Sequence, residues 1–460
     1  MRMLNRQTNL EKILAGARRV LDQMGMRVEN RQCLEALERF GAAIDFPQQK
    51  ARMSKDVVDR MLKIVQDEQQ GWQDRAPQLA QRIGIGGGGT CPWYYDEFER
   101  KAKRATETEC IRAFKVIDTS PVKSTTPPIS NSDCAPKFES IRILWLGIET
   151  LKHSRVGGTD LFFPEQIPFA VELGRLYRDD PKCFIPTGNC PVSPLTVSKT
   201  IADLAVAKAP YGVNYGVPTM PIAGANAPIT PSGTAVIGVA EILGGYVLAK
   251  ALNPQNPVSA TALSARVDFR TGEITYLAPE VFAADVAIAE VMKHCLGLSC
   301  GLFGIYIDAK LPGMRAVYEK LMRSLALGLY GNLSGFEGTL NHGKVFSYTQ
   351  LMLDCDLHSH IATYTKEAAV EDDDLAVEEI LKLGWDSPGY MIAEHTLHRM
   401  RRGWQSSICA GPGETEEQTL QRACERWQEN LKHYEPPDHS NEFLKDLRAI
   451  GEQARMTLSG

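Results

Sequence analysis

Along the first eighty residues, apolar positions recur every three to four residues and are separated by polar ones. In one run they are Leu10, Ile13, Leu14, Ala17 and Leu21, and a second run lies between Val57 and Val65. This spacing places apolar side chains on one side of a helix. We therefore expect residues 1–80 to form a helical segment ahead of the main domain.

From about residue 81 the pattern changes to short strand-like runs that alternate with helical stretches. The candidate strands are Arg82–Gly86, Phe114–Thr119, Leu151–Val156, Cys183–Thr187, Gly212–Gly216, Val258–Leu263, Leu302–Ile307 and Asn332–Glu337. Helical patterns between them include Phe138–Thr150, Thr196–Lys208, Gly233–Leu252, Pro279–Leu296 and Pro312–Leu329. Eight strands alternating with helices favour an α/β fold with a closed (β/α)8 TIM barrel over residues 81–355. An open doubly wound sheet is the alternative, and the second and third strands have the weakest patterns.

The rest of the chain, residues 356–460, is helical in pattern and more charged. Asp372, Asp373 and Asp374 are expected at the N-terminus of a helix, where the helix dipole favours negative charge. A solvated acidic face is the alternative explanation. A last helical segment is expected over residues 415–456, broken at Pro436–Pro437.

The composition is that of a globular protein, and its charge argues against one class of partner. The 460 residues are 43% hydrophobic and 23% charged, with a formal net charge of −5. Nucleic-acid binding depends on a basic surface that contacts phosphates. The overall acidity therefore argues against a nucleic-acid partner.

Cysteine usage and the N-terminus indicate the compartment. The eleven cysteines are scattered through hydrophobic segments. Together with a polar N-terminus that lacks the apolar run of a signal peptide, this predicts reduced thiols in a cytoplasmic protein. We also expect no segment apolar enough to span a membrane.

A glycine run follows the first candidate strand. In a barrel of this kind the working residues follow each strand, at the carboxyl end. Gly87 and Gly88, within the run Gly86–Gly89, would permit a phosphate or cofactor to approach the backbone closely. The run lacks the GK[ST] ending of a P-loop and does not match GxGxxG.

Three aromatic residues come directly after the glycine run. Trp93, Tyr94 and Tyr95 could surround a cation with their ring faces, as aromatic cages do for quaternary ammonium groups. The alternative is that the rings pack a loop against the top of the barrel.

Charged and polar residues also follow the seventh and eighth candidate strands. Lys310 is a candidate partner for a ligand carboxylate, balanced by Asp308, and the alternative is an ion pair that closes the loop. Glu337 and His342 follow the eighth strand, where His342 in its glycine-flanked loop is the best candidate for a polar substrate contact. An exposed loop histidine is the alternative.

Metal and nucleophile chemistry have little support in the sequence. His395 and His398 could share a helix face, but no Cys, Asp or Glu accompanies them at a recognised ligand spacing. The serines show no nucleophile-elbow context. We therefore predict neither a metal site nor a catalytic triad.

Several segments together resemble the trimethylamine:corrinoid methyltransferase family, in the same order from about residue 10 to 450. They are Gly86–Thr90, Pro191–Leu195, Met220–Thr230, Arg270–Gly272 with Ala278–Glu280, Asp308–Lys310 with Tyr318–Glu319, and His395–His398. The stretch MPIAGANAPIT, residues 220–230, is the most specific of them, and the glycine run is the least.

This resemblance implies a (β/α)8 barrel with helical extensions that works with a separate corrinoid protein. The methyl group of an amine would pass to cob(I)amide on that partner and give methylcob(III)amide, so that the chain itself holds no permanent cofactor. Some members carry pyrrolysine near the strand-seven exit, where this sequence has only standard residues such as Lys310. The chain therefore resembles the pyrrolysine-free branch, which includes enzymes acting on quaternary amines such as glycine betaine. Asn189, in an unusual Gly–Asn–Cys sequence, would contact the substrate tail, and a homo-oligomer is expected.

The chemistry expected of this branch agrees with the absence of an evident acid–base pair. A quaternary ammonium leaves as a neutral amine, so that no general acid is needed, and the enzyme has to hold the cation and orient one methyl group. Two other functions remain open. One is a TIM-barrel enzyme acting on a small phosphate-bearing ligand, and the other is a non-catalytic betaine-binding protein.

Overall fold

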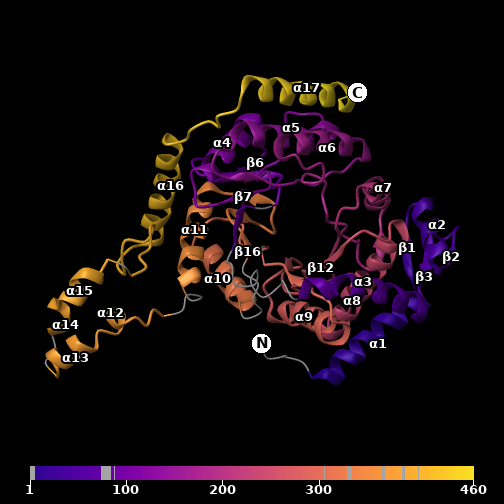
Figure 1. Cartoon of the computed structure of the whole chain (residues 1–460), viewed down its shortest axis with the longest axis horizontal. Coiled ribbons are helices and arrows are strands. Elements are labelled where there is room, and N and C mark those ends of the chain that lie inside the picture. Colours follow the sequence, from indigo (N-terminus) through magenta and orange to yellow (C-terminus); the bar gives the residue numbers. More distant parts are fainter. Residues whose placement is uncertain are drawn as a thin grey trace.

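The protein belongs to the mixed α/β class, with helices arranged around short parallel strands (Figure 1). The computed structural model describes residues 6–73, 84–87, 89–304, 306–328, 334–363, 368–385, 389–401 and 403–459. Beyond α11 the chain leaves this body as a group of short helices and then returns to it.

The N-terminal segment combines the expected helices with a small sheet. Its elements are α1 (Gln7–Gln23), β1 (Met26–Val28), α2 (Arg31–Phe40), β2 (Ala43–Asp45), β3 (Lys50–Arg52) and α3 (Lys55–Gln73). α1 buries Leu10, Ile13, Ala17 and Leu21, which confirms the predicted apolar face. β1 also pairs in parallel with β9 (Thr196–Val197), which ties the segment to the main domain. The strands were not predicted because three residues are too few to show a period of two.

The main domain contains two parallel sheets. One has the order β16 (Ser334–Phe336), β4 (Gly84–Gly87), β7 (Ser124–Thr125), β8 (Arg155–Val156), and the other has the order β10 (Tyr215–Thr219), β12 (Val258–Ala262), β15 (Gly301–Leu302). A single parallel bridge joins Gly188 to Gly216 of β10. In each sheet the order of the parallel strands follows the chain, except that β16, the last of them, lies beside β4, the first. Over the described residues, strand pairing does not join the two sheets.

Two of the predicted strands are wrong. Residues 114–118 of the second lie in a helix, α4 (Glu107–Asp118), and the strand itself, β7, comes later, at Ser124–Thr125. The apolar run was misassigned because a buried helix and a buried strand look alike over six residues. The fourth, Cys183–Thr187, forms turns and is followed only by the bridge at Gly188. The other six overlap observed strands.

Helices follow the strands, much as predicted. They are α5 (Pro136–Thr150), α6 (Ile167–Arg178) after a 3-10 turn at Pro164–Gln166, α7 (Lys199–Lys208) with a 3-10 turn at Ala209–Tyr211, α8 (Pro231–Leu252), α9 (Pro279–Glu290) with a π turn at Val291–Cys295, α10 (Met314–Gly328) and α11 (Tyr348–Thr363).

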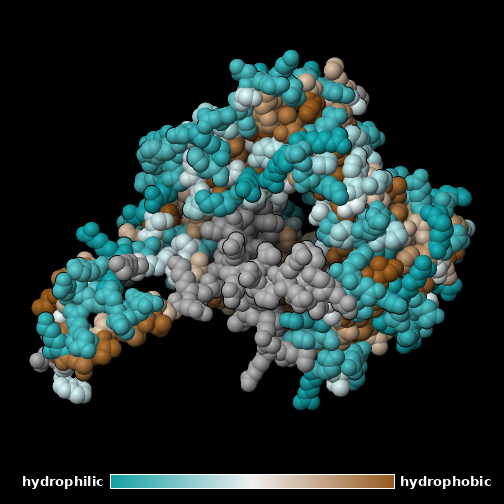
Figure 2. Space-filling model, viewed as in Figure 1, coloured by the Kyte–Doolittle hydropathy of each residue, from teal (hydrophilic) through white to brown (hydrophobic). Residues whose placement is uncertain are grey.

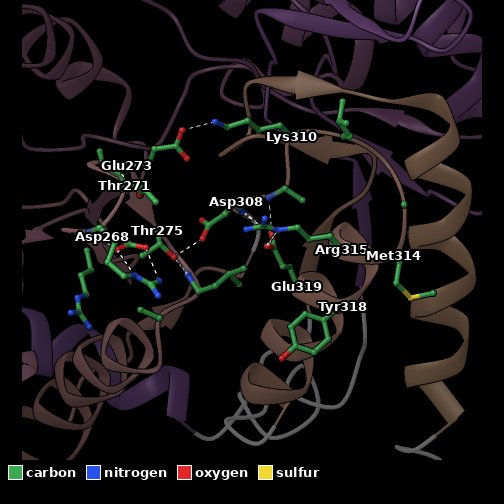
Figure 3. A pocket seen from close by; sticks show the side chains of 18 of the residues that line it. Asp268, Thr271, Glu273, Thr275, Asp308, Lys310, Met314, Arg315, Tyr318 and Glu319 are labelled. Carbon is green, nitrogen blue, oxygen red and sulfur yellow. Dashed lines mark hydrogen bonds and ion pairs between the residues drawn. The ribbon is translucent and has the colours of Figure 1, made fainter. Parts of the chain in front are cut away.

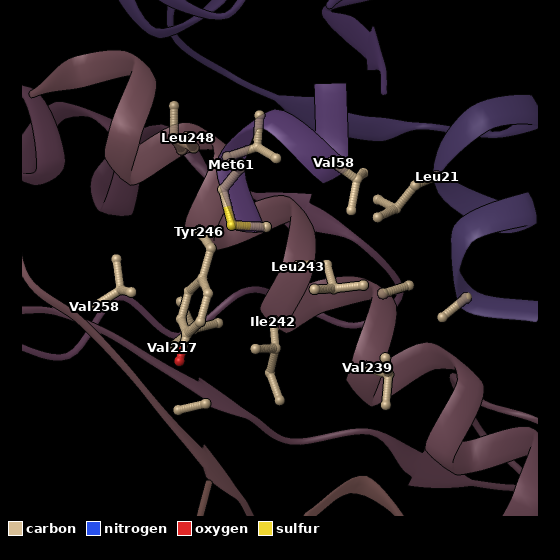
Figure 4. Close-up of a cluster of buried hydrophobic side chains, with 14 of the residues drawn as sticks. Leu21, Val58, Met61, Val217, Val239, Ile242, Leu243, Tyr246, Leu248 and Val258 are labelled. Carbon is tan, nitrogen blue, oxygen red and sulfur yellow. The ribbon is translucent and has the colours of Figure 1, made fainter. Parts of the chain in front are cut away.

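Helix α8 forms the centre of the largest core cluster (Figure 4). Its Ile242 and Tyr246 lie near Val217 and Val258 of the sheet, and Leu21, Val58 and Met61 come from the N-terminal helices. The close fit depends on glycine, since a Cβ at Gly245 would lie 2.7 Å from Val217. Among the described helices, α8 has the length and composition of a membrane span, contrary to the expectation from sequence, and 78% of that window is buried within the protein.

Two small sheets extend beyond the carboxyl ends of the parallel strands. One has the order β17 (Thr339–Leu340), β18 (Val345–Phe346), β5 (Trp93–Asp96), β6 (Lys101–Lys103), and it is built from the segments that follow β4 and β16. The other has the order β11 (Ile222–Ala223), β13 (Ala265–Val267), β14 (Ile274–Thr275), and it follows β10 and β12. Both sheets therefore lie at the end of the domain where the candidate site was predicted.

The C-terminal segment consists of helices, as predicted. They are α12 (Asp372–Leu375), α13 (Val377–Leu383), α14 (Gly389–Ile392), α15 (Glu394–Arg399), α16 (Glu416–Lys432) and α17 (Asn441–Leu458). Asp372, Asp373 and Asp374 form the first turn of α12, which confirms their placement at a helix start. α12 to α15 lie apart from the body, whereas α17 lies along α5 and α6 (Figure 1).

Candidate functional site

Loops that follow β14, β15 and β17 meet around Asp308. The Thr275 hydroxyl donates a hydrogen bond of 2.5 Å to Asp308 Oδ2, and the Tyr276 backbone N–H donates one of 3.0 Å to Oδ1. His342 Nε2 lies 3.3 Å from the same Oδ1. Burial raises the pKa of Asp308, but His342 and the two hydrogen bonds outweigh it and hold the pKa below the ordinary 3.8. Asp308 is therefore a carboxylate at neutral pH.

Helix α10 fixes the loop that carries Asp308. The backbone N–H groups of Asp308 and Ala309 donate hydrogen bonds of 2.9 and 2.8 Å to Glu319 Oε2. Arg315 holds the other carboxylate oxygen of Glu319 at 2.8 Å. The first turns of α10 thus hold the backbone on which Asp308 is presented (Figure 3).

Four rings form a cluster beside Asp308, which we call the ring cluster: Phe303, Tyr276, Tyr306 and His342. Ring centroids are 5.2 Å apart for Tyr276–Tyr306, 5.2 Å for Tyr276–His342 and 5.8 Å for Phe303–Tyr306. Tyr276 is buried and Tyr306 is partly exposed. Burial, more than any nearby charge, raises the pKa of both tyrosines to about 12. Both are therefore neutral phenols at physiological pH, with ring faces suited to a cation.

A left-handed backbone places His342 against Tyr276. Asn341, His342 and Gly343 have φ values of 49°, 58° and 73°. The N–H groups of Asn341 and His342 donate to the carbonyl oxygens of Ala309 and Ile307, both at 2.8 Å. A Cβ at Gly343 would lie 2.5 Å from Cε1 of Tyr306, so the loop is packed directly on that ring. Side chains rarely adopt such φ values, and runs of them gather at functional sites.

A carboxylate from the other parallel sheet acts on the ring cluster. Asp160 follows β8, and its charge contributes to the raised pKa of Tyr306. Desolvation by the surrounding protein raises the pKa of Asp160, and Lys208 lowers it in part. The Asp160 side chain is nevertheless accessible to solvent. Asp160 is therefore a carboxylate close enough to Tyr306 for its charge to act on the pKa of that tyrosine.

Asn189 is a buried part of the framework and is bonded to Lys208. Its side chain is buried, donates to the Thr187 carbonyl at 2.9 Å and accepts from Lys208 Nζ at 2.8 Å. Lys208 also donates to the carbonyl oxygens of Pro186 and Gly188 at 3.0 and 3.3 Å. Asn189 was predicted to contact the substrate tail, but its polar atoms are already engaged with protein groups.

The three consecutive aromatic residues do not form one cage. They lie on β5, where successive side chains point to opposite faces. Tyr94 is buried in one core cluster, whereas Tyr95 is buried in another with Ile307 and Leu340. The Arg104 guanidinium lies over the Trp93 ring at 4.3 Å. The prediction that the three rings form one cage is therefore wrong, because their side chains lie on opposite faces of β5.

The remaining predicted residues have the following places. Lys310 forms an exposed 2.6 Å ion pair with Glu273, which is the loop-closing alternative. Glu337 is fully buried against His358 of α11, where burial raises its pKa to about 6, so it points toward a helix and away from the mouth. Gly87 is a strand residue paired with Thr125, not part of a cradle loop. Gly88 lies outside the described residues.

An open cleft of about 1070 Å³ lies beside Asp308. Its lining includes Asp268, Arg270, Glu273 and Tyr318, as well as Asp308 itself (Figure 3). In the part of the chain that the structure describes, no three His, Cys, Asp or Glu side chains are grouped so that they could hold a metal ion. The described arrangement therefore supplies ring faces and carboxylates.

Sequence reasoning missed Phe303, Tyr276, Tyr306, Asp160 and Lys208. Asp160 follows the third predicted strand by four residues, so the rule that working residues follow strands could have found it. Phe303 and Tyr306 were counted inside a predicted strand, although the observed strand ends at Leu302. Tyr276 follows β14 in a small sheet that no local sequence pattern predicted.

The family model described as "Trimethylamine methyltransferase (MTTB)" matches residues 170–456, more than half of the chain. A trimethylamine methyltransferase MttB of Methanosarcina barkeri (strain Fusaro / DSM 804) is 30% identical over 280 residues, which are 59% of this chain and 56% of that protein. A trimethylamine methyltransferase MttB of Desulfitobacterium hafniense (strain DSM 10664 / DCB-2) is 24% identical over 94% of this chain and 90% of its own. A glycine betaine methyltransferase of Desulfitobacterium hafniense (strain Y51) is 26% identical over 56% of this chain and 55% of its own.

The chain spans little more than half the length of this Methanosarcina barkeri protein and of two other trimethylamine methyltransferases of Methanosarcina that it matches. Among solved structures, the monomethylamine methyltransferase MtmB of Methanosarcina barkeri is similar, with a TM-score of 0.48 and 11% identity over 99% of this chain and 93% of that one. The match to the family model confirms, at the level of the family, the resemblance seen in the sequence segments.

Proposed function

Since the chain belongs to the trimethylamine methyltransferase family, we propose that it transfers a methyl group from a methylated amine to a separate corrinoid protein. The match to the family model carries this proposal, and the ring cluster beside two carboxylates supports it. We further propose that the two parallel sheets belong to one closed (β/α)8 barrel, because β16 lies beside β4 and strand order otherwise follows the chain.

The proposed substrate is a quaternary amine, such as a betaine. The neutral rings of Tyr276 and Tyr306 hold the positive head group, and Asp308 and Asp160 add negative charge around it. The corrinoid, carried by the partner, supplies the cobalt nucleophile that accepts the methyl group. As the carbon–nitrogen bond breaks, its electron pair stays on nitrogen and a neutral amine leaves, so no side chain has to supply a proton. The described residues fit this division of work, since they gather cation-binding groups.

The rings contribute more than shape. A desolvated cation–π contact contributes up to about 2 kcal/mol, and two or three such contacts are sufficient for millimolar binding, which requires about 4 kcal/mol. Because the charge on nitrogen disappears during transfer, moderate binding is preferable to tight binding. A partly exposed ring such as Tyr306, close enough to Asp160 for its charge to act on it, provides contacts of this strength.

The activity is tested by mixing the purified chain with cob(I)alamin and a panel of quaternary and tertiary amines. The cobalt absorption spectrum should report methylation with at least one amine. The assay is repeated with corrinoid proteins from the organisms that contain the related methyltransferases. If calorimetry detects amine binding but no cobalt acceptor is methylated, the chain is a binding protein and the proposed activity is wrong.

Tyr306 provides the residue-level test. Tyr306→Leu should weaken binding of the active amine about tenfold, because one cation–π contact is lost, whereas Tyr306→Phe should bind within about twofold of the native chain. Calorimetry measures both dissociation constants. Tyr434→Leu, on the distant α16–α17 connection, is the control and should leave affinity unchanged. If the Leu and Phe variants at position 306 bind the amine with equal affinity, the Tyr306 ring is not part of the amine-binding site.

A further inference from the structure

Helix α10 has an inverted distribution of side chains. Its buried face carries Glu319, Lys320 and Arg323, and Arg323 is paired with Asp285 at 2.8 Å. Its outward face, extended by one residue of the preceding loop, carries apolar side chains that are 42–64% exposed: Leu311, Met314, Tyr318, Met322 and Leu325. Spacings of three and four residues put these five on one line. We call this line the α10 stripe. Amphipathic helices normally do the reverse, so the stripe is suited to being covered.

A second exposed apolar surface lies on the arm, which we define as residues 368–404 and which contains α12 to α15. It exposes Val370, Leu375, Val377, Ile380, Leu381, Trp385, Tyr390, Met391, Ile392, Leu397, Met400 and Trp404. These are half of the large apolar side chains that are exposed in the described chain. None of the residues in the four helices is buried. Figure 2 shows brown side chains gathered along the arm, at the lower left.

The arm has internal polar bonds but little else to hold its helices. Arg399 pairs with Asp373, and the backbone N–H of His395 donates to the Glu379 carboxylate at 3.3 Å. At its base, Trp404 stacks on His360 with centroids 4.1 Å apart and donates to Ser359 at 2.9 Å. Helices of four to seven residues are not stable alone in water, and they require tertiary packing. That packing has to come from outside the arm.

We propose that the arm of one copy of this chain packs on the α10 stripe of a second copy. Both surfaces are present on every molecule, both are apolar, and the arm extends away from its own body (Figure 1). Surfaces of this kind are typical of permanent interfaces, which resemble a protein core cut in half. A partner that must also exist free in solution requires a more polar surface.

The direction of α10 also favours a second copy over a protein seated at the mouth. Residues 311–325 extend about 20 Å along the helix, at about 1.5 Å per residue. The helix begins at the loop of Asp308 and runs away from it, so a protein docked over the mouth reaches only the first turn. This inference does not depend on the proposed activity.

The oligomeric state is measured by size-exclusion chromatography with light scattering on the full chain. The native protein should be an oligomer. Tyr318→Glu with Met322→Glu, in the stripe, should give a monomer, and so should Leu381→Glu with Trp385→Glu, in the arm. Phe162→Glu with Met456→Glu changes two exposed apolar residues elsewhere and should leave the mass unchanged. Circular dichroism verifies that each variant is folded.

Mixing the two monomeric variants tests whether the arm meets the stripe. The stripe variant keeps its arm and the arm variant keeps its stripe, so the mixture should form a one-to-one pair that neither variant forms alone. A mixture that stays monomeric would show that the two surfaces do not pair. A native chain that is monomeric at all concentrations would overturn the proposal. If that monomer floats with phosphatidylglycerol–phosphatidylcholine vesicles, the arm binds lipid instead.

Discussion

At the scale of single residues, Lys208 is a buried cation close enough to the exposed Asp160 for the two charges to act on each other. Its side-chain nitrogen donates hydrogen bonds to Asn189 and to two backbone carbonyls, and Asp160 adds an opposite charge. Burial lowers the pKa of Lys208 to about 8, against the effect of Asp160. The lysine thus holds the backbone around Asn189, and it does so at a cost in solvation.

This cost predicts a pH dependence of stability. Between pH 8 and 10.5 the folded chain has released the Lys208 proton, whereas the unfolded chain still holds it, so the folded state gains stability as pH rises. Relative to Lys208→Met, the native free energy of unfolding should rise by about 3 kcal/mol across this window. Urea unfolding at several pH values measures it. The control is Lys199→Met, which removes an exposed lysine of the same helix and should show no such rise. If the difference in free energy of unfolding between the native chain and Lys208→Met does not change with pH, the lowered pKa of Lys208 is contradicted.

At the scale of elements, the loop of residues 341–343 couples backbone strain to the ring cluster. Gly343→Ala would force a Cβ into the Tyr306 ring at 2.5 Å, on a backbone with φ of 73°. Gly272 has the same φ with no atom within 4 Å of its would-be Cβ, so Gly272→Ala isolates the backbone cost. Gly272→Ala should lose about 1–2 kcal/mol of unfolding free energy, and Gly343→Ala should lose more because the Tyr306 ring must also shift. Only Gly343→Ala should weaken amine binding, by about tenfold as measured by calorimetry. If the two variants bind the amine with equal affinity, the loop of residues 341–343 does not contribute to the binding site.

The same elements show how far sequence reasoning extends. Long helices such as α8 and strands such as β12 were predictable, because many residues repeat one pattern. α4 was misread, because Phe114, Val116 and Ile117 form a short apolar cluster that a strand also permits. The site was only half predictable: Asp308 and His342 follow strands, whereas Tyr276 reaches them through a hydrogen bond between distant loops. The cage prediction for Trp93, Tyr94 and Tyr95 was wrong because side chains that are neighbours in sequence point to opposite faces of β5.

At the scale of the whole molecule, the C-terminal helices fasten the end of the chain to its first half. Leu447, Ala454 and Leu458 of α17 belong to the core cluster that contains Trp145 of α5. The connection before α17 adds a bond of 2.9 Å from the Tyr434 hydroxyl to the Thr150 carbonyl. His439 Nε2 lies 2.9 Å from the Ile148 carbonyl oxygen. Contacts between residues about 300 positions apart stabilise the whole fold, because they exist only when both regions are folded.

Gly451 is the point where α17 comes closest to α5, and it provides the test of this coupling. A Cβ there would lie 2.3 Å from two atoms of the Trp145 ring, and the Arg142 guanidinium lies over the same ring, 4.1 Å from its centroid. Gly451→Leu should therefore lower the free energy of unfolding by about 1–3 kcal/mol, as overpacking does, and should speed proteolysis before α17. Gly413→Leu, in an exposed loop with no atom within 4 Å of the added Cβ, should do neither. Thermal unfolding and timed digestion measure both effects. If the two variants behave alike, α17 rests on the body without contributing to its stability, and the fold is held by the main domain alone.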